Sequence, residues 1–254
     1  MHILCTNDDG IDAEGLRALE AVAAEFGEVW TVAPATEQSA KSHSFTMHDP
    51  LRVHSHGERR FSVTGTPADC TYLAVHHLLP RKPDLVLSGI NRGSNLSNDV
   101  LYSGTVAGAR EAAGVGIPAL AASLWVRSGQ PRWDTAQAMV RLVTARILRH
   151  GLPERILLNL NVPDVPVGEV RGLRVAPLGR RWYAPAVEQK TDPRGRRYYW
   201  IGGDHERFDD APESDGPLCE SGWAVVTPLQ MDLTAHELLP ALREWGLEEP
   251  CSTN

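Results

Sequence analysis

The chain has 254 residues, of which 42% are hydrophobic and 22% charged, a balance typical of a folded globular protein rather than a disordered one. Its 25 lysines and arginines against 32 aspartates and glutamates give a net charge of −7, so we expect neither nucleic acid nor an anionic membrane as a partner. The four cysteines have no paired short spacing, which argues against a zinc site or a disulfide framework. The N-terminal residues contain two acids and no basic leader segment, so we expect a cytoplasmic protein.

Short apolar runs alternate with helical patterns through residues 3–160. The runs at 3–6, 29–33, 84–87, 119–123 and 156–160 predict strands. Apolar or small residues at helical spacing predict helices over 16–26, 66–79, 104–113 and 133–148. The longest apolar run, 117–126, is half of the roughly 20 residues that cross a bilayer, so it is interpreted as a buried strand. This alternation predicts a doubly wound, Rossmann-like α/β fold with a mostly parallel sheet.

The pattern changes after residue 162 to short runs broken by proline and glycine, at 173–176, 182–187, 198–201 and 224–227, before a helix over 234–245. The polar segment 191–196 indicates the turn of a hairpin. We therefore divide the chain into an α/β core, 1–162, and a C-terminal part, 163–254, with a hairpin, a returning strand and a terminal helix, all within one domain. The hairpin predicts an oligomer, because it would otherwise expose Trp182, Tyr183, Tyr198, Tyr199 and Trp200.

Three polar loops are predicted to meet at the carboxyl ends of the strands, where open parallel sheets bind their ligands. They contain the pair Asp8 and Asp9, then Ser39, then Asn91. Carboxylate, hydroxyl and amide oxygens are the ligands that Mg²⁺ or Mn²⁺ prefers. A turn with an Asx-type cap would explain the aspartates alone, but two like charges at a strand end repel unless a cation or hydrogen-bond donors neutralise them. We therefore predict a metal site formed by the three loops.

A hydroxyl-rich turn, Ser103-Gly104-Thr105, directly precedes a predicted helix. Its free N–H groups and the positive end of the helix dipole suit a phosphate, although an ordinary N-cap would have the same residues. The segment 65–69, with Thr66 and Pro67, is explained by helix capping alone.

Among ten histidines, His43 is the one candidate for function, because it shares a loop with Ser39 and an imidazole near a phosphate can bind it or protonate a leaving oxygen. Lys41 and Arg92 lie on two of the converging loops. Each has the charge to contact a phosphate, and solvated surface charge is the simpler interpretation of both.

Five ordered motifs lie at 3–10, 32–39, 65–70, 88–95 and 102–106, with a looser continuation at 227–229 and 232–236. Together they resemble the SurE family of survival-protein nucleotidases. The resemblance implies a metal-dependent phosphatase acting on nucleoside 5′- and 3′-monophosphates, with exopolyphosphatase activity in some members. It also implies a homodimer or tetramer formed through the C-terminal hairpin and a swapped helix.

The resemblance also assigns roles to residues of this sequence. The family's metal ligands correspond to Asp8, Asp9, Ser39 and Asn91, which would hold one Mg²⁺ or Mn²⁺ per subunit, and either aspartate could activate the attacking water or Asp9 act as nucleophile. Its phosphate-pocket positions correspond to Asn95, Ser103, Gly104 and Thr105.

Two positions depart from the family pattern. Ser94 stands where proline is common, which loosens the loop without removing a ligand. Lys41 stands where small residues are usual, which could alter substrate preference.

The sequence bears on three alternative functions. A receiver-like signalling domain needs a phospho-accepting aspartate after the third strand and a lysine after the fifth, where this chain has 88–91 and 159–161 without either. A haloacid-dehalogenase-type phosphatase needs an Asp-x-Asp motif, which Asn7-Asp8-Asp9 does not provide. A non-catalytic nucleotide-binding module stays open as an alternative.

Overall fold

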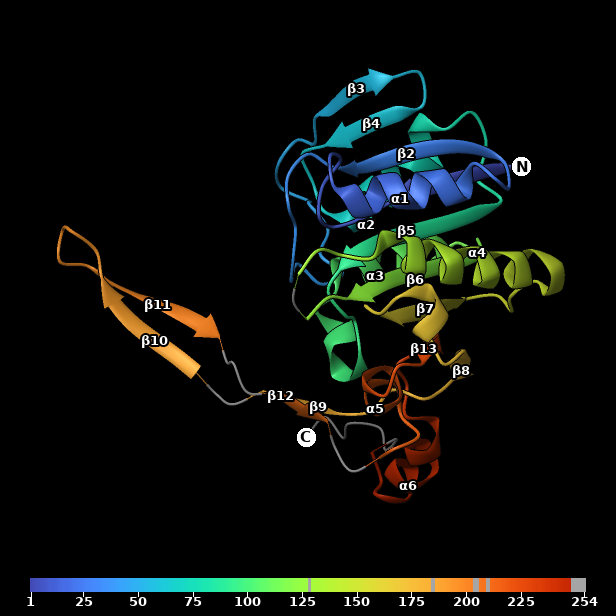
Figure 1. The fold of residues 1–254 in the computed structure, drawn as a ribbon. Coiled ribbons are helices and arrows are strands. Elements are labelled where there is room, and N and C mark those ends of the chain that lie inside the picture. Colours follow the sequence, from blue (N-terminus) through green and yellow to red (C-terminus); the bar gives the residue numbers. More distant parts are fainter. Residues whose placement is uncertain (128, 184–185, 203–205, 209–210, 248–254) are drawn as a thin grey trace, which may run out of the picture.

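The computed structural model describes residues 1–127, 129–183, 186–202, 206–208 and 211–247. Its centre is a nine-stranded sheet with the order β3-β4-β2-β1-β5-β6-β7-β13-β8, shown in Figure 1. The strands are β1 (His2–Thr6), β2 (Glu28–Pro34), β3 (Val53–Gly57), β4 (Arg60–Val63), β5 (Leu85–Arg92), β6 (Ala119–Trp125), β7 (Ile156–Pro163), β8 (Leu173–Val175) and β13 (Ala224–Gln230).

Within the run β4-β2-β1-β5-β6-β7, each pair of adjacent strands is parallel, which confirms the predicted doubly wound α/β fold. α1 and α4 pack in one hydrophobic core, and α2 and α3 pack in a second core. The helices are α1 (Glu14–Ala23), α2 (Pro67–Leu73), α3 (Gly104–Gly114), α4 (Trp133–His150), α5 (Asp215–Glu220) and α6 (Leu239–Glu244). No helix in the described part of the chain is long and apolar enough to span a membrane.

Local sequence explains why these elements form where they do. Every residue of β6 is buried, as a central parallel strand covered on both faces requires. The start of α2 is a capping box, because Thr66 Oγ1 accepts from the N–H of Asp69 and the Asp69 carboxylate accepts from the N–H of Thr66. After Leu73 the helix continues as a π-helix, Ala74–Leu78, so the predicted helix at 66–79 consists of two parts.

The C-terminal part of the chain adds strands to the sheet and also extends away from it. β13 pairs antiparallel with β7, and β8 pairs parallel with β13 at the edge. The predicted hairpin is present as β10 (Ala186–Thr191) and β11 (Arg197–Gly202), which extend away from the sheet in Figure 1. Its turn has the expected closing bond, from the N–H of Asp192 to the carbonyl of Arg196 at 2.9 Å.

Two details predicted for the C-terminal part of the chain are wrong. Trp182 and Tyr183 lie outside the hairpin, in β9 (Arg181–Tyr183). The backbone of β9 pairs antiparallel with β12 (Glu206–Phe208) instead of continuing into β10. The predicted run 182–187 thus spans two strands, and its residues 184–185 lie outside the described residues. The expected helix over 234–245 is a 3-10 turn, His236–Leu238, followed by the short α6.

Candidate active site

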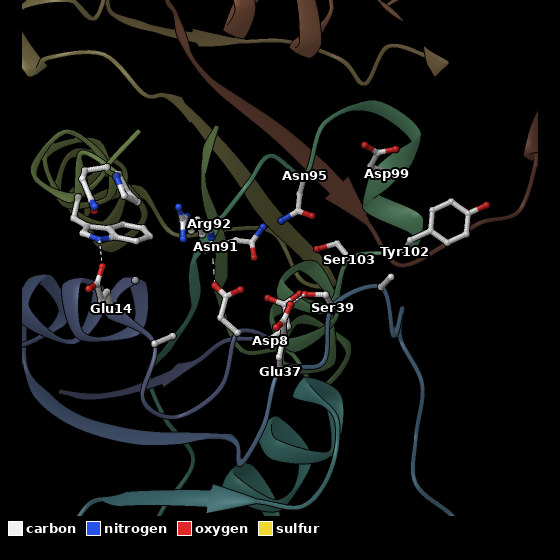
Figure 2. Close-up of a pocket in the computed structure, with 17 residues that line it drawn as sticks. Asp8, Glu14, Glu37, Ser39, Asn91, Arg92, Asn95, Asp99, Tyr102 and Ser103 are labelled. Carbon is white, nitrogen blue, oxygen red and sulfur yellow. Dashed lines mark hydrogen bonds between the residues drawn. The ribbon is translucent and has the colours of Figure 1, made fainter. Parts of the chain in front are cut away.

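A pocket of about 650 Å³ opens at the carboxyl ends of β1, β2 and β5. Figure 2 shows Asp8, Ser39 and Asn91 gathered in its middle, Glu14 to one side and Tyr102 to the other. The loops therefore meet as the strand order predicts. The predicted residues among its lining are Asp8, Asp9, Ser39, Asn91, Arg92, Asn95 and Ser103.

Asp8 lies at the end of β1 against the first turn of α3. Its side chain is almost fully buried, and its Oδ1 accepts a hydrogen bond from the hydroxyl of Thr105 at 2.5 Å. The close approach needs Gly104, because a Cβ at that position would lie 2.8 Å from Cβ of Asp8. Burial raises the pKa of Asp8 to about 6, although the Thr105 hydroxyl opposes the shift, and the charge of Asp9 adds to it. The fold thus holds a carboxylate whose ionisation it disfavours.

Asp9 is half-buried beside it. Burial raises the pKa of Asp9, the N–H of Arg92 opposes this by donating to Oδ2 at 3.3 Å, and the charge of Glu37 raises the pKa further. No ion pair joins Asp8 or Asp9 to a basic side chain within 4.0 Å among the residues that the structure describes. Nearby carboxylates without such partners are a setting in which a cation is favourable.

Ser39 and Asn91 are oriented so that their oxygens stay available as acceptors. The hydroxyl of Ser39 donates to Oε1 of Glu37 at 2.8 Å, and Nδ2 of Asn91 donates to the carbonyl of Gly93 at 2.9 Å. Asn91 follows an irregularity in β5, where the pairing with β6 shifts register between Ser88 and Asn91. Such shifts re-aim side chains near sites, and after this one Asn91 pairs again with Ser123 of β6.

These donors fit a hard divalent cation. The set offers two carboxylates, one hydroxyl oxygen and one amide oxygen, with no sulfur or imidazole, as Mg²⁺ and Mn²⁺ prefer. The described residues contain no group of three or more His, Cys, Asp or Glu arranged to hold a metal. An ion here would therefore depend on the neutral oxygens of Ser39 and Asn91 as much as on Asp8 and Asp9.

Asn95 and Ser103 form the wall of the pocket next to these donors (Figure 2). The backbone of Asn95 is held from two sides, since its N–H donates to Oδ1 of Asn161 at 2.8 Å and its carbonyl accepts from Nδ2 of Asn159. Ser103 is the N-cap of α3, and its Oγ accepts from the N–H of Val106 at 3.0 Å. Because the Ser103 oxygen accepts that bond, its own proton is available for a ligand in the pocket.

Four residues that the sequence analysis considered do not line the pocket. His43 instead contacts Glu111 on α3, with its Nε2 2.9 Å from a carboxylate oxygen. Gly104 and Thr105 are buried behind Asp8, where Thr105 orients the carboxylate; their contact with a phosphate stays a prediction. Lys41 is exposed outside the lining, whereas Arg92 is exposed at the rim.

Ser94, the first departure from the family pattern, takes part in a contact with the C-terminal part of the chain. Its Oγ accepts from the guanidinium of Arg181 in β9 at 3.0 Å. The same guanidinium pairs with Asp99 at 2.8 Å, and Asp99 lines the pocket. The strand β9 thereby fixes one edge of the site.

Sequence reasoning missed several residues of the lining. Glu37 lies in the same loop as Ser39, but its acceptor role toward Ser39 depends on the loop's conformation. Glu14 and Trp133 begin α1 and α4, and the strand-end rule could have found them, since helices that follow parallel strands begin at the same edge. Asp99 is in the 3-10 helix Ser97–Leu101, which had no pattern to reveal it.

The chain is similar to proteins that are already known. The family model "Survival protein SurE" matches residues 3–185. A curated protein of Geotalea uraniireducens named 5′-nucleotidase SurE is 46% identical over 247 residues, covering 97% of this chain and 100% of its own length. One of the same name from Chloroflexus aggregans is 47% identical, covering 98% of this chain and 100% of its own.

A solved structure gives the same result. The crystal structure of the SurE protein from Aquifex aeolicus is similar to this one with a TM-score of 0.85 and 35% identity, over 97% of this chain and 100% of that chain. The similarity in sequence and in fold extends over nearly the full length, including the C-terminal part. The chain belongs to the SurE family.

Proposed function

We propose that this protein is a metal-dependent nucleotidase that hydrolyses nucleoside 5′-monophosphates to nucleoside and inorganic phosphate. The observation that carries the proposal is the convergence of Asp8, Asp9, Ser39 and Asn91 in one pocket at the ends of three parallel strands. The curated relatives named 5′-nucleotidase support the substrate class. The helix start beside these donors suits an anion.

Bound Mg²⁺ or Mn²⁺ would supply charge neutralisation and polarise the phosphorus. The chain's own donors would orient the phosphate: Ser103 and Asn95 line the pocket, and Nδ2 of Asn95, which donates one hydrogen bond to Oγ of Ser123 at 2.8 Å, keeps a second N–H for a ligand. Asp9 is the more exposed carboxylate, and its Oδ2 is engaged by the N–H of Arg92. We therefore assign to Asp9 Oδ1 the role of accepting a proton from the attacking water.

The reaction consumes one water and needs no other reactant. The water oxygen forms the new bond to phosphorus, the bond between phosphorus and the ester oxygen breaks, and a proton ends on the oxygen that leaves with the nucleoside. Asp8 is the more buried carboxylate, and the hydroxyl of Thr105 holds it in place. Its role is therefore to offer the metal ion a carboxylate oxygen at a fixed position.

The proposal extends to nucleoside 3′-monophosphates and to terminal phosphates of polyphosphate, on the resemblance of the motifs. It also includes a homodimer or tetramer formed through the β10–β11 hairpin and the terminal helix. The exposed side chains of Trp200 and Ile201, 62% and 89% accessible, support that surface as an interface. Light scattering at micromolar concentration tests it, and a monomeric mass would contradict it.

The activity is tested by phosphate release from a panel of nucleoside 5′- and 3′-monophosphates and polyphosphate, with EDTA, Mg²⁺ and Mn²⁺ compared. We expect release with metal, loss with EDTA, and loss in Asp9→Asn with the fold intact by circular dichroism. Release that persists in EDTA or in Asp9→Asn would contradict the proposal. Nucleotide binding without release would instead favour the non-catalytic module.

A further inference from the structure

The pocket continues beyond the proposed metal ligands to an aromatic wall. Figure 2 labels Glu14 in this part of the pocket. The lining there includes Glu14 and Gly15 at the start of α1, and Gln130, Pro131 and Trp133 where the chain leads into α4. The whole pocket, about 650 Å³, falls within the roughly 300–1,000 Å³ of pockets that enclose small organic ligands. A phosphate beside Ser103 would leave this wall free to contact the leaving group.

Trp133 is held in place before any ligand arrives. Its indole N–H donates to Oε2 of Glu14 at 3.2 Å, and its ring packs against the hydrophobic core shared by α1 and α4. The ring reaches so close to α1 that a Cβ on Gly15 would lie 3.1 Å from its Cη2 atom. Trp133 is only half-buried and lines the pocket. A fixed, partly exposed indole gives a flat contact surface at little cost in side-chain entropy.

Tyr102, at the other side of the pocket in Figure 2, differs from Trp133 in its exposure and in its contacts. It is 62% exposed, and its side chain has no hydrogen bond or ring contact with the residues that the structure describes. A ligand that stacked there would have to order the ring first, at an entropic cost. Between the two aromatic residues of the lining, Trp133 is the better platform.

We propose that Trp133 stacks against the nucleobase of the substrate and thereby favours nucleotides over phosphate esters that lack a base. This inference rests on the proposed nucleotidase function and deepens it. The phosphate would lie at Asn95 and Ser103, and the nucleoside would extend past the carboxylates toward Glu14. Stacking suits any base, because every base has a π-face, so the contact selects for a base without selecting among bases.

The test compares 5′-AMP with ribose 5-phosphate, which has the same ester and sugar but no base. In Trp133→Leu we expect KM for 5′-AMP to rise about tenfold, the effect of losing one stacking contact, with kcat unchanged. KM for ribose 5-phosphate should stay within about twofold of wild type, since that substrate has no base to stack. Trp133→Phe keeps an aromatic ring and should restore most of the affinity for 5′-AMP.

The matched control is Tyr102→Leu, which removes the other aromatic residue of the lining. It should change KM for the two substrates by the same factor. Equal effects of Trp133→Leu on both substrates would show that the indole only packs α4 against α1, and would overturn the inference. A rise in KM for 5′-AMP alone in Tyr102→Leu would also overturn the inference.

If wild type releases phosphate from neither substrate, the proposed function fails and the inference is decided by binding. Calorimetry with 5′-AMP and ribose 5-phosphate should then show weaker 5′-AMP binding in Trp133→Leu alone. Unchanged 5′-AMP binding in that variant would contradict the stacking.

Discussion

The hydroxyl of Thr105 in the first turn of α3 donates a 2.5 Å hydrogen bond to Oδ1 of Asp8 at the end of β1. Two segments 97 residues apart thus fix one carboxylate oxygen, which leaves the other side of Asp8 for the pocket. The helix start that the sequence assigned to phosphate therefore also positions a proposed metal ligand.

Thr105→Val removes this hydroxyl at nearly constant volume. We expect phosphate release to fall at least about tenfold, because Asp8 loses the bond that orients it and small misplacements of catalytic groups are costly. Kinetics with 5′-AMP measures the effect. Thr144→Val on α4 is the matched control, since Thr144 is also fully buried but its hydroxyl has no partner among the described residues. Equal activity of the two variants would contradict the role of Thr105.

Asp8→Asn should stabilise the metal-free protein while abolishing activity. The pKa of Asp8 is raised to about 6 in the fold from 3.8, so its ionised form costs stability above about pH 6, and the cost vanishes below the unfolded-state pKa. The neutral amide in Asp8→Asn should therefore raise the free energy of unfolding by up to about 3 kcal/mol at pH 8. Melting in EDTA at pH 8 and at pH 4 measures it, and the gain should shrink at the lower pH.

Asp84→Asn is the control, for which we expect the opposite effect on stability. Hydrogen bonds from Arg81 lower the pKa of Asp84 to about 2, so its charge favours folding above the unfolded-state value and this contribution is lost as pH falls toward 2. Asp84→Asn should therefore lower the melting temperature slightly at pH 8. A lower melting temperature for Asp8→Asn in EDTA would contradict the account of Asp8.

Asp215 connects the C-terminal part to the loop that leads into the site. Its carboxylate is fully buried and accepts from the N–H and hydroxyl of Ser97 and from the N–H groups of Gly179 and Gly216. Asp215→Asn places an amide donor among these donors, so we expect a loss of about 2–3 kcal/mol in the free energy of unfolding. Urea unfolding measures it against the exposed neighbour variant Glu213→Gln, which should be neutral. Similar stability of both variants would show that the contacts of Asp215 contribute little.

The central strands and their helices could be predicted because burial on both faces leaves continuous apolar runs, as in β1 and β6. The strand β3 was missed, since all five of its residues are exposed and it shows no alternation. The short α5 was also missed, and it depends on tertiary contacts of Asp215 rather than on local pattern.

The residues of the site also divide into those that the sequence could predict and those that it could not. Asp8, Asp9, Ser39 and Asn91 were predictable because the strand-end rule places their loops together. His43 was the weakest choice, since shared loop position does not determine orientation, and its ring turns to Glu111. Arg181 reaches the site through a distant strand, which no local pattern encodes. The strand-end rule places the start of α4 at this edge, but the contact of Trp133 with Glu14 depends on packing.

The most direct test of the account is a crystal of this protein soaked in Mn²⁺ and measured at the manganese absorption edge. We predict one anomalous peak per subunit within coordination distance of oxygens from Asp8, Asp9, Ser39 and Asn91, and its loss in Asp9→Asn crystals. A peak bound elsewhere in the pocket, for example by Glu37 and Asp99, or no peak at saturating Mn²⁺, would contradict the proposed metal site.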